Sequence, residues 1–133
     1  MKTKLVIKKS TIPRAGKGLF TETPIKRGTK IVEYKGKIST WAEADHDDGR
    51  NAYIYYINRQ RVIDAKNRKT ALARYANDAK GIKSIRGLNN NCTYSIENNK
   101  VYIKAIRNII PGSELLVSYG KEYWDVIKKN KVF

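Results

Sequence analysis

The sequence predicts a single domain that is mainly β, with few and short helices. Short runs rich in β-branched and aromatic residues recur along the chain, as is typical of strands. Stretches with helical character are scarce by comparison. A chain of 133 residues has the length of one domain and buries roughly two thirds of its unfolded surface. We therefore expect one domain over 1–133, with a core of about 4–124 and a short basic C-terminal extension at 125–133.

The expected strands follow one another at short intervals. They are "KLVIK" at 4–8, "KIVEYKGKI" at 30–38, "YIYYI" at 53–57, "RVIDA" at 61–65, "TYSIE" at 93–97, "VYIKAI" at 101–106 and "ELLVSY" at 114–119. Asn98 and Asn99 separate two of these runs, which predicts a tight hairpin because asparagine tolerates positive φ. Pro111 and Gly112 predict a turn before the last strand.

Helical character is limited to three stretches. "TWAEADH" begins at Thr40, and Glu43 lies at the spacing of a capping box. "KTALARYA" at 69–76 and "KEYWDVIKK" near the C-terminus are the other two. The sequence shows no repeat, low-complexity tract or linker that would divide the chain.

The composition is strongly basic. The chain has 28 Lys and Arg against 12 Asp and Glu, a formal charge of +16, which predicts attraction to polyanions or acidic protein surfaces. The charge is dispersed from Lys2 to Lys131, and Lys, Asn, Ile and Tyr are abundant together, as an AT-biased coding sequence would make them. A selected polyanion surface and compositional drift therefore stay open as explanations.

Cysteine and histidine are too rare for several kinds of chemistry. Cys92 is the single cysteine, so no intramolecular disulfide and no cysteine-based zinc cluster can form. His46 is the single histidine, which removes most transition-metal and catalytic-triad arrangements. No apolar run approaches the ~20 residues of a membrane span. We expect an intracellular protein of a reducing compartment, with no metal and no membrane, in chromatin or in a prokaryotic or virus-infected cytoplasm.

Two short motifs have ordinary structural interpretations. "DHDDG" at 45–49 is acidic, but its glycine comes one place late for a calcium loop and no Glu closes it, so a solvated loop is favoured. "RAGKGLF" at 14–20 holds Gly16 and Gly18 but lacks the third glycine and long helix of a dinucleotide site. On spacing alone a β-turn is favoured there.

"RYANDA" at 74–79 is harder to explain as structure alone. Asn77 and Asp78 interrupt residues that favour a helix, and their short polar side chains compete with helical hydrogen bonds. Tyr34, Tyr94 and Tyr119 lie in or beside expected strands, and each hydroxyl needs a partner if it is buried. Most of the tyrosines are still explained by ordinary packing.

In order, these motifs resemble the SET-domain protein-lysine methyltransferases. The likeness is carried by "GKGLF", "EYKG", "YIYYI" with "VIDA", "ARYAND" with "NNC", and "ELLVSYG", over about 4–124. It implies a β-clip-like fold of small sheets in which the Asn77 segment and the last strand form a knot-like crossing. It also implies S-adenosylmethionine as cofactor and a lysine of a histone or another basic, chromatin- or nucleic-acid-associated protein as substrate.

The resemblance assigns roles to particular residues. Tyr119 would be the catalytic tyrosine, and Tyr34, Tyr94 and Tyr119 would line the substrate-lysine channel. The cofactor-binding residues implied are Lys17, Gly18, Leu19, Arg74, Tyr75, Asn77, Asp78, Tyr119 and Trp124. Trp124 could equally serve in helix packing. No metal site is implied.

The chain departs from the family pattern in three places. Asp78 stands where most members have histidine, and "KGIKSIRGLNN" at 80–90 replaces a short proline-containing link. No cysteine-rich segment follows the last motif, so another segment or a second subunit must close the site, and dimerisation stays open. The alternative function is a catalytically weak or inactive SET-fold module that binds nucleic acid or chromatin through its basic surface.

Overall fold

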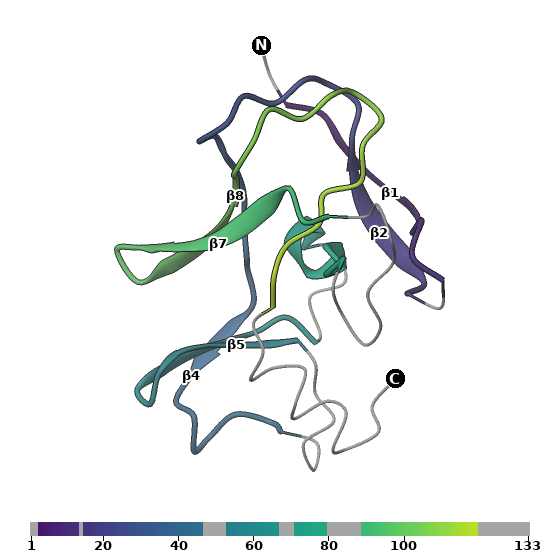
Figure 1. Cartoon of the computed structure of the whole chain (residues 1–133). Helices are drawn as coiled ribbons and strands as arrows, with labels where there is room; N and C mark the ends of the chain where they lie inside the picture. Colours follow the sequence, from purple (N-terminus) through teal and green to yellow (C-terminus); the bar gives the residue numbers. More distant parts are fainter. Residues whose placement is uncertain (1–2, 14, 47–52, 67–70, 80–88, 120–133) are drawn as a thin grey trace.

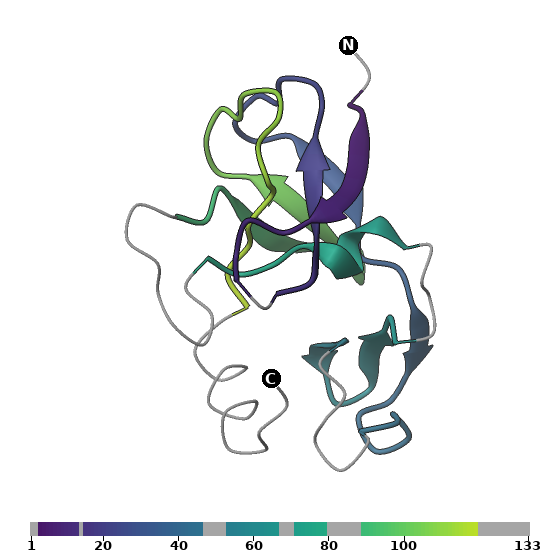
Figure 2. The same ribbon diagram turned by 90° about the vertical axis from the view of Figure 1, so that its right-hand side faces the viewer.

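The computed structural model describes residues 3–13, 15–46, 53–66, 71–79 and 89–119. Within these ranges the protein is mainly β, which confirms the expected fold class. The strands form three small sheets, β1–β2, β3–β8–β7 and β4–β6–β5, all paired antiparallel. Figures 1 and 2 show β4–β6–β5 at one end of the molecule and the loops that follow β2 and β8 at the other.

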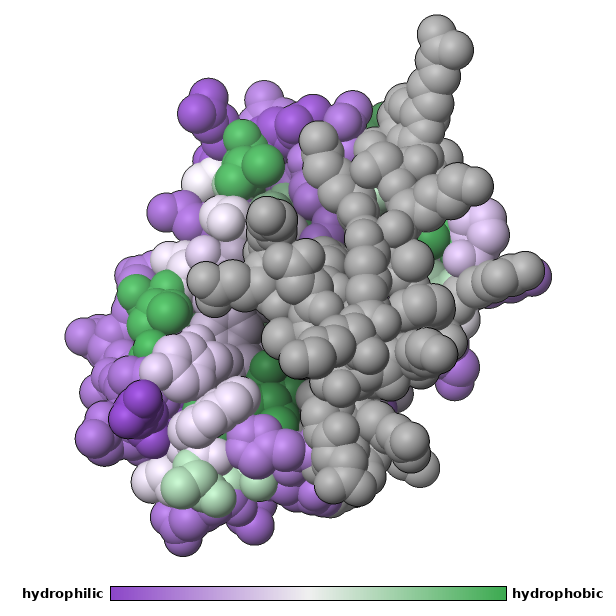
Figure 3. All heavy atoms as spheres, turned by 60° about the horizontal axis from the view of Figure 1, so that its bottom comes forward, coloured by the Kyte–Doolittle hydropathy of each residue, from purple (hydrophilic) through white to green (hydrophobic). Residues whose placement is uncertain are grey.

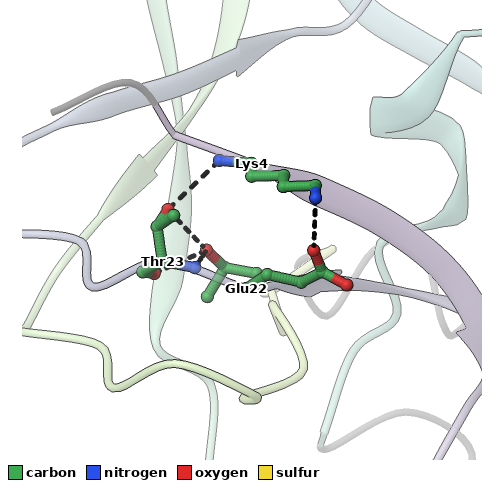
Figure 4. Close-up of polar contacts among 4 residues, drawn as sticks. Lys4, Glu22 and Thr23 are labelled. Carbon is green, nitrogen blue, oxygen red and sulfur yellow. Dashed lines mark hydrogen bonds and ion pairs between the residues drawn. The ribbon is translucent and has the colours of Figure 1, made fainter.

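The first sheet is a hairpin of β1 (Leu5–Lys9) and β2 (Lys17–Thr21). β2 was not expected, because the "GKGLF" glycines favoured a turn. Gly16 does adopt the left-handed conformation at φ 71°, but the chain then runs extended and buries Leu19 completely. The open end of the hairpin is tied by Lys4, whose backbone N donates to Thr23 Oγ1 at 3.1 Å and whose Nζ pairs with Glu22 at 3.3 Å (Figure 4).

The second sheet orders β3 (Lys30–Glu33), β8 (Lys100–Ala105) and β7 (Cys92–Glu97) side by side. Asn98 and Asn99 have φ of 52° and 63° in the two-residue turn between β7 and β8, so the predicted hairpin is confirmed. β8 is the central strand, and its side chains alternate between outward-facing and buried positions. Val101 and Ile103 are fully buried there and form the middle of the core.

The third sheet orders β4 (Lys37–Ser39), β6 (Arg61–Asp64) and β5 (Ile54–Asn58). The expected run over 30–38 is broken into β3 and β4 around Gly36. A Cβ on Gly36 would lie 2.4 Å from the backbone oxygen of Asp64, so glycine allows the chain to pass close to the end of β6.

Helical structure is shorter than the sequence predicts. The stretch expected over 69–76 contains a 3-10 helix, η2 (Leu72–Tyr75). The capping-box contact between Thr40 and Glu43 forms, with Glu43 N donating to Thr40 Oγ1 at 3.2 Å, but only a single turn follows in the described residues. The C-terminal stretch expected as a helix lies outside the described residues.

The last expected strand, 114–119, pairs with three different segments instead of one partner strand. Glu114 bridges Phe20, Leu116 bridges Asn77 in parallel, and Val117 bridges Cys92 in parallel. The segment therefore runs between the residues that follow η2 and the start of β7. Leu115 and Val117 are fully buried in the core, so this crossing joins the hairpin, η2 and the second sheet.

The outer surface carries isolated apolar side chains. In the described residues Ile38, Trp41, Tyr56, Ile96, Ile106 and Ile110 are the large apolar side chains that stay exposed. Figure 3 shows the lower face, where the described surface is largely hydrophilic and its hydrophobic patches are small and separate.

Candidate active site

Asn77 sits where three segments meet. η2 ends at Tyr75, and Ala76 is extended at ψ 129°, so the chain leaves the helix before Asn77. The Asn77 side-chain Nδ2 donates to the backbone oxygen of Lys17 at 3.1 Å and to Glu114 Oε2 at 3.2 Å. Its own carbonyl accepts the Val117 N–H at 2.8 Å. The residue that interrupts the predicted helix therefore ties "GKGLF" to the crossing segment.

Glu114 is a buried carboxylate at the centre of this junction. Its exposed fraction is 7%, and it accepts hydrogen bonds from Ser10 Oγ at 2.7 Å, Thr11 N at 2.9 Å and Thr11 Oγ1 at 2.6 Å, besides the one from Asn77. A Cβ on Gly18 would lie 2.3 Å from Glu114 Oε2. Gly18 therefore leaves the space that this carboxylate occupies, and the loop between β1 and β2 is held against the crossing.

Asp78 supports the segment that carries Tyr119. The side chain is buried, its Oδ1 accepts the Asn90 Nδ2–H at 3.0 Å, and its Oδ2 accepts the Tyr119 backbone N–H at 2.9 Å. The residue that replaces the usual histidine thus holds Tyr119 by its backbone. Asn90 is the last residue of the 80–90 insertion, and its Oδ1 also accepts the Ala79 N–H at 2.7 Å.

Asn91 clamps the crossing segment from the other side. Its Nδ2 donates to the carbonyl of Glu114 at 2.9 Å, and its Oδ1 accepts the Leu116 N–H at 2.9 Å. The Leu116 carbonyl in turn accepts N–H groups from Asn91 and Cys92 at 3.0 and 2.9 Å. These bonds fix the backbone at Leu116, three residues before Tyr119.

Four tyrosine rings gather beside the crossing. Tyr94 is the centre: its ring centroid lies 6.1 Å from that of Tyr34, 4.8 Å from that of Tyr55 and 6.4 Å from that of Tyr119, the last in a stacked arrangement. Tyr34 and Tyr55 are 6.0 Å apart. The structure thus brings together the three tyrosines predicted for the lysine channel and adds Tyr55 from β5. We call Tyr34, Tyr55, Tyr94 and Tyr119 the tyrosine cluster.

Backbone carbonyls orient two hydroxyl groups of the tyrosine cluster. Tyr119 donates to the Ala76 carbonyl, next to Asn77, and Tyr34 donates to the Tyr53 carbonyl at 2.8 Å. Burial raises the pKa of the Tyr55 hydroxyl above its ordinary value of 10.0. The cluster is therefore an aromatic surface in which the backbone fixes the hydroxyl groups of Tyr34 and Tyr119.

Arg74 and Tyr75, two of the predicted cofactor residues, have their observed contacts away from the Asn77 junction. Arg74 Nη1 donates to the carbonyls of Ala65 and Lys66 at 2.8 and 2.9 Å, and its guanidinium lies 4.1 Å from the Tyr53 ring centroid and 5.3 Å from that of Tyr75. Arg74 therefore joins η2 to the residues that follow β6, and the Tyr75 ring lies against its guanidinium. Their predicted contact with a cofactor stays a prediction, and Trp124 lies outside the described residues.

The remaining predicted cofactor residues come together at the junction. Lys17 is exposed and presents its backbone oxygen to Asn77, Gly18 lies over Glu114, and Leu19 is buried in the core. Asn77 itself is half-buried, and among the described residues no donor reaches its Oδ1. An amide oxygen with spare acceptor capacity beside an exposed backbone segment suits the ammonium or adenine amino group of S-adenosylmethionine. The residues present therefore fit that cofactor.

The described residues contain no group of three or more His, Cys, Asp or Glu side chains placed to hold a metal ion. In the same part of the chain no helix is long and apolar enough to cross a membrane.

Sequence reasoning missed Glu114 and Tyr55. The sequence predicts Glu114 only as the first residue of a strand, and its polar partners Ser10, Thr11 and Asn77 are remote in sequence. The signal that could have found it was an acidic residue opening an otherwise apolar run, "ELLV". Tyr55 lies in "YIYYI", where alternation places it on the face opposite Tyr56, but the pattern does not say which face meets the other tyrosines.

Two known methyltransferases align with most of this chain. The chain is 27% identical over 119 residues to the N-lysine methyltransferase KMT5A-A of Danio rerio and 30% identical over 124 residues to the histone-lysine N-methyltransferase ASHH1 of Arabidopsis thaliana. The alignments cover 79% and 82% of this chain but 32% and 23% of those proteins. The chain thus spans a third or less of the length of these relatives.

Solved structures and a family model agree with these relatives. The methyltransferase domain of human PR domain-containing protein 2 has a TM-score of 0.64 and 26% identity, over 87% of this chain and 76% of that one. A humanized mutant of the Chaetomium thermophilum Polycomb Repressive Complex 2 bound to an inhibitor has a TM-score of 0.72 over 96% of this chain and 16% of that one, a likeness of fold at 24% identity. The family model described as SET domain matches residues 16–120. This chain belongs to the SET domain family.

Proposed function

We propose that the chain is an S-adenosylmethionine-dependent protein-lysine N-methyltransferase. The observation that carries the proposal is the tyrosine cluster, which stands beside the Asn77 junction in a chain of the SET domain family. Both relatives described above are named as lysine methyltransferases, which supports the same reaction here.

The tyrosine cluster suits the activation of a lysine amine. Free lysine has a pKa near ~10.4, and only its neutral form is nucleophilic. An aromatic channel removes water from the ammonium and lowers its pKa, so no dedicated base is obligatory. The Tyr119 hydroxyl donates a hydrogen bond to the Ala76 carbonyl, which holds its oxygen in a fixed orientation at the tyrosine cluster.

The junction residues hold the cofactor side of the site. When bound, S-adenosylmethionine supplies a methyl group activated on a positively charged sulfur. Asn77 Oδ1 and the exposed backbone at Lys17 would bind its polar groups, while Glu114 holds Asn77 and the β1–β2 loop in place. Holding amine and methyl in line can contribute on the order of 7 kcal/mol or more to the barrier reduction.

The substrate class follows from charge as well as from the relatives. We propose a histone or another basic protein associated with chromatin or nucleic acid. A charge of +16 repels a free basic tail at long range, whereas the nucleic acid of a nucleosome or ribonucleoprotein attracts the enzyme. Activity on nucleosomes should therefore fall steeply between low and physiological salt.

The same charge favours a second candidate function. A catalytically weak or inactive SET-fold module would bind nucleic acid or chromatin through its basic surface and would have no use for the cofactor. Binding of S-adenosylmethionine separates the two functions, because only the enzyme gains RT ln(1 + [L]/Kd) of stability from it.

The proposal is tested by incubating the chain with labelled S-adenosylmethionine and with free histones, nucleosomes and a basic ribosomal protein side by side. We expect one of these proteins to become labelled, and we expect the label to be on its lysine residues. Thermal shift with the cofactor runs in parallel without added metal. Absence of stabilisation at millimolar cofactor would leave the binding module as the function.

A further inference from the structure

A second surface lies at the other end of the molecule from β4–β6–β5. The loops that follow β2 and β8 meet there, as Figures 1 and 2 show. Between them runs an open groove of about 480 Å³, within the size range of ligand sites. We call it the basic-apolar groove; its lining residues are Pro24, Ile25, Lys26, Arg27, Asn108, Ile109, Ile110 and Pro111.

The basic-apolar groove has a rigid floor. Ile25 and Ile109 exchange two backbone hydrogen bonds of 2.9 and 2.8 Å, and both side chains are buried, at 3% and 4% exposed. Arg27 N donates to Asn108 Oδ1 at 2.9 Å, which ties the two loops a second time. The shape is therefore formed by the fold itself, so that a ligand would not have to order the loops.

The rim combines apolar surface with positive charge. Ile110 is 73% exposed, the largest fraction among the large apolar side chains of the described residues. Pro24 and Pro111 are exposed beside it, and so are Lys26 and Arg27. The described residues that line the groove include no acidic side chain, so none of them neutralises the two cations.

We propose that the basic-apolar groove binds an acidic segment of a partner protein, with an apolar side chain over Ile110 and carboxylates on Lys26 and Arg27. Charge complementarity selects this occupant, because a chain of charge +16 attracts acidic partners. A second copy of the chain carries the same charge and is repelled. Nucleic acid would use the two cations but leaves Ile110 and the prolines in contact with water. The inference does not depend on methyl transfer.

Fluorescence anisotropy of the full chain with a labelled peptide tests the proposal. The probe is a fluorescein-labelled peptide in which Leu follows every pair of Asp residues. We expect it to bind, and we expect the double variant Lys26→Glu with Arg27→Glu to weaken binding about tenfold or more. Ile110→Ser should weaken it about fivefold, because the apolar contact is lost while the charge stays.

Matched variants separate the groove from net charge. Lys8→Glu with Lys9→Glu makes the same change in charge on exposed residues of β1, and Ile96→Ser removes an exposed isoleucine from β7. Both should bind the probe within about twofold of wild type, the shift expected from long-range charge alone. Melting curves of all variants verify that each is folded.

Several results would overturn the inference. An equal loss in the Lys8 and Lys9 variant would mean that binding reflects net charge alone. Labelled duplex DNA, or a peptide with Ser in place of Leu, could bind tightly and with the same affinity to wild type and to Ile110→Ser. Either result would make the surface a general polyanion site. Self-association that Ile110→Ser abolishes would assign the groove to a second copy, and absence of peptide binding would remove the docking role.

Discussion

Replacing Glu114 with alanine should lower the free energy of unfolding by about 3–5 kcal/mol. The carboxylate is 7% exposed and accepts hydrogen bonds from Ser10 Oγ, Thr11 N, Thr11 Oγ1 and Asn77 Nδ2. Each hydrogen bond to a charged group contributes about 1.5–3 kcal/mol, but the buried charge itself costs several kcal/mol, so the net loss is smaller than the sum.

The matched control for Glu114→Ala is Glu22→Ala. Glu22 pairs with Lys4 at 3.3 Å, but its side chain is 46% exposed, and such surface pairs contribute about 0.2–1 kcal/mol (Figure 4). Glu114→Gln provides an intermediate variant. It keeps the shape of the side chain but replaces one acceptor oxygen with an N–H₂ group that faces donors. Its loss of unfolding free energy should therefore fall between those of Glu22→Ala and Glu114→Ala.

The assay is urea unfolding monitored by circular dichroism. The slope of the unfolding free energy against urea concentration should be the same in all variants. In a thermal melt the Glu114→Ala loss corresponds to roughly 10–20 °C for a domain of this size. A Glu114→Ala protein that loses no more stability than Glu22→Ala would refute the reasoning that this carboxylate holds the junction together.

Three further predictions concern neighbouring groups. Gly18→Ala places a Cβ 2.3 Å from Glu114 Oε2 and should cost about 1–3 kcal/mol of stability and weaken cofactor binding in calorimetry; an unchanged melting temperature would contradict it. Burial raises the pKa of the Cys92 thiol to about 12 from 9.0, so above pH 9 the unfolded chain loses this proton while the folded chain keeps it, and stability falls as pH rises. From pH 8 to pH 10 wild type should therefore lose about 1.4 kcal/mol more than Cys92→Ala in urea unfolding, and equal losses would contradict this. Tyr94→Phe empties hydroxyl space at the centre of the tyrosine cluster, so mass spectrometry of the product should show an additional methyl group at a largely unchanged rate; a large loss of rate would contradict it.

Local chemistry explains which parts of the fold could be predicted. The hairpin at Asn98 and Asn99 depends on two residues that tolerate positive φ, and both adopt it. β2 was missed because glycines weaken the strand pattern of "KGLFT", whereas pairing with β1 and burial of Leu19 decide its conformation. The 114–119 run was predicted as a strand, but its partners Phe20, Asn77 and Cys92 come from three distant segments that no local pattern connects.

In the candidate site, too, some residues could be predicted from the sequence and others could not. Asn77 could be singled out because it interrupts a helical pattern, and the structure places it where the β1–β2 loop meets the crossing segment. Tyr34, Tyr94 and Tyr119 were predicted to line the lysine channel; the rings of Tyr34 and Tyr119 lie near that of Tyr94, and the channel role stays a prediction. Glu114 could not be predicted, because its bond to Ser10 spans 104 residues and its bond to Asn77 spans 37. A hydrogen bond between remote residues leaves no periodic trace in the sequence.

Tyr119→Phe tests most directly whether methyl transfer takes place at the tyrosine cluster. The substitution keeps the ring that stacks on Tyr94 and removes only the hydroxyl that Ala76 orients, so packing is nearly unchanged. Loss of one such oriented group costs about 10² to 10³ in rate. If Tyr119 had a structural role alone, removal of its hydroxyl would instead lower the free energy of unfolding by about 1 kcal/mol and leave turnover per folded molecule the same.

The measurement is methyl transfer and thermal stability of wild type and Tyr119→Phe on the same preparations, with cofactor saturating and the substrate identified by labelling. The account predicts a folded variant whose turnover falls about a hundredfold or more. A folded Tyr119→Phe protein with wild-type turnover would contradict it and would remove this residue from the mechanism.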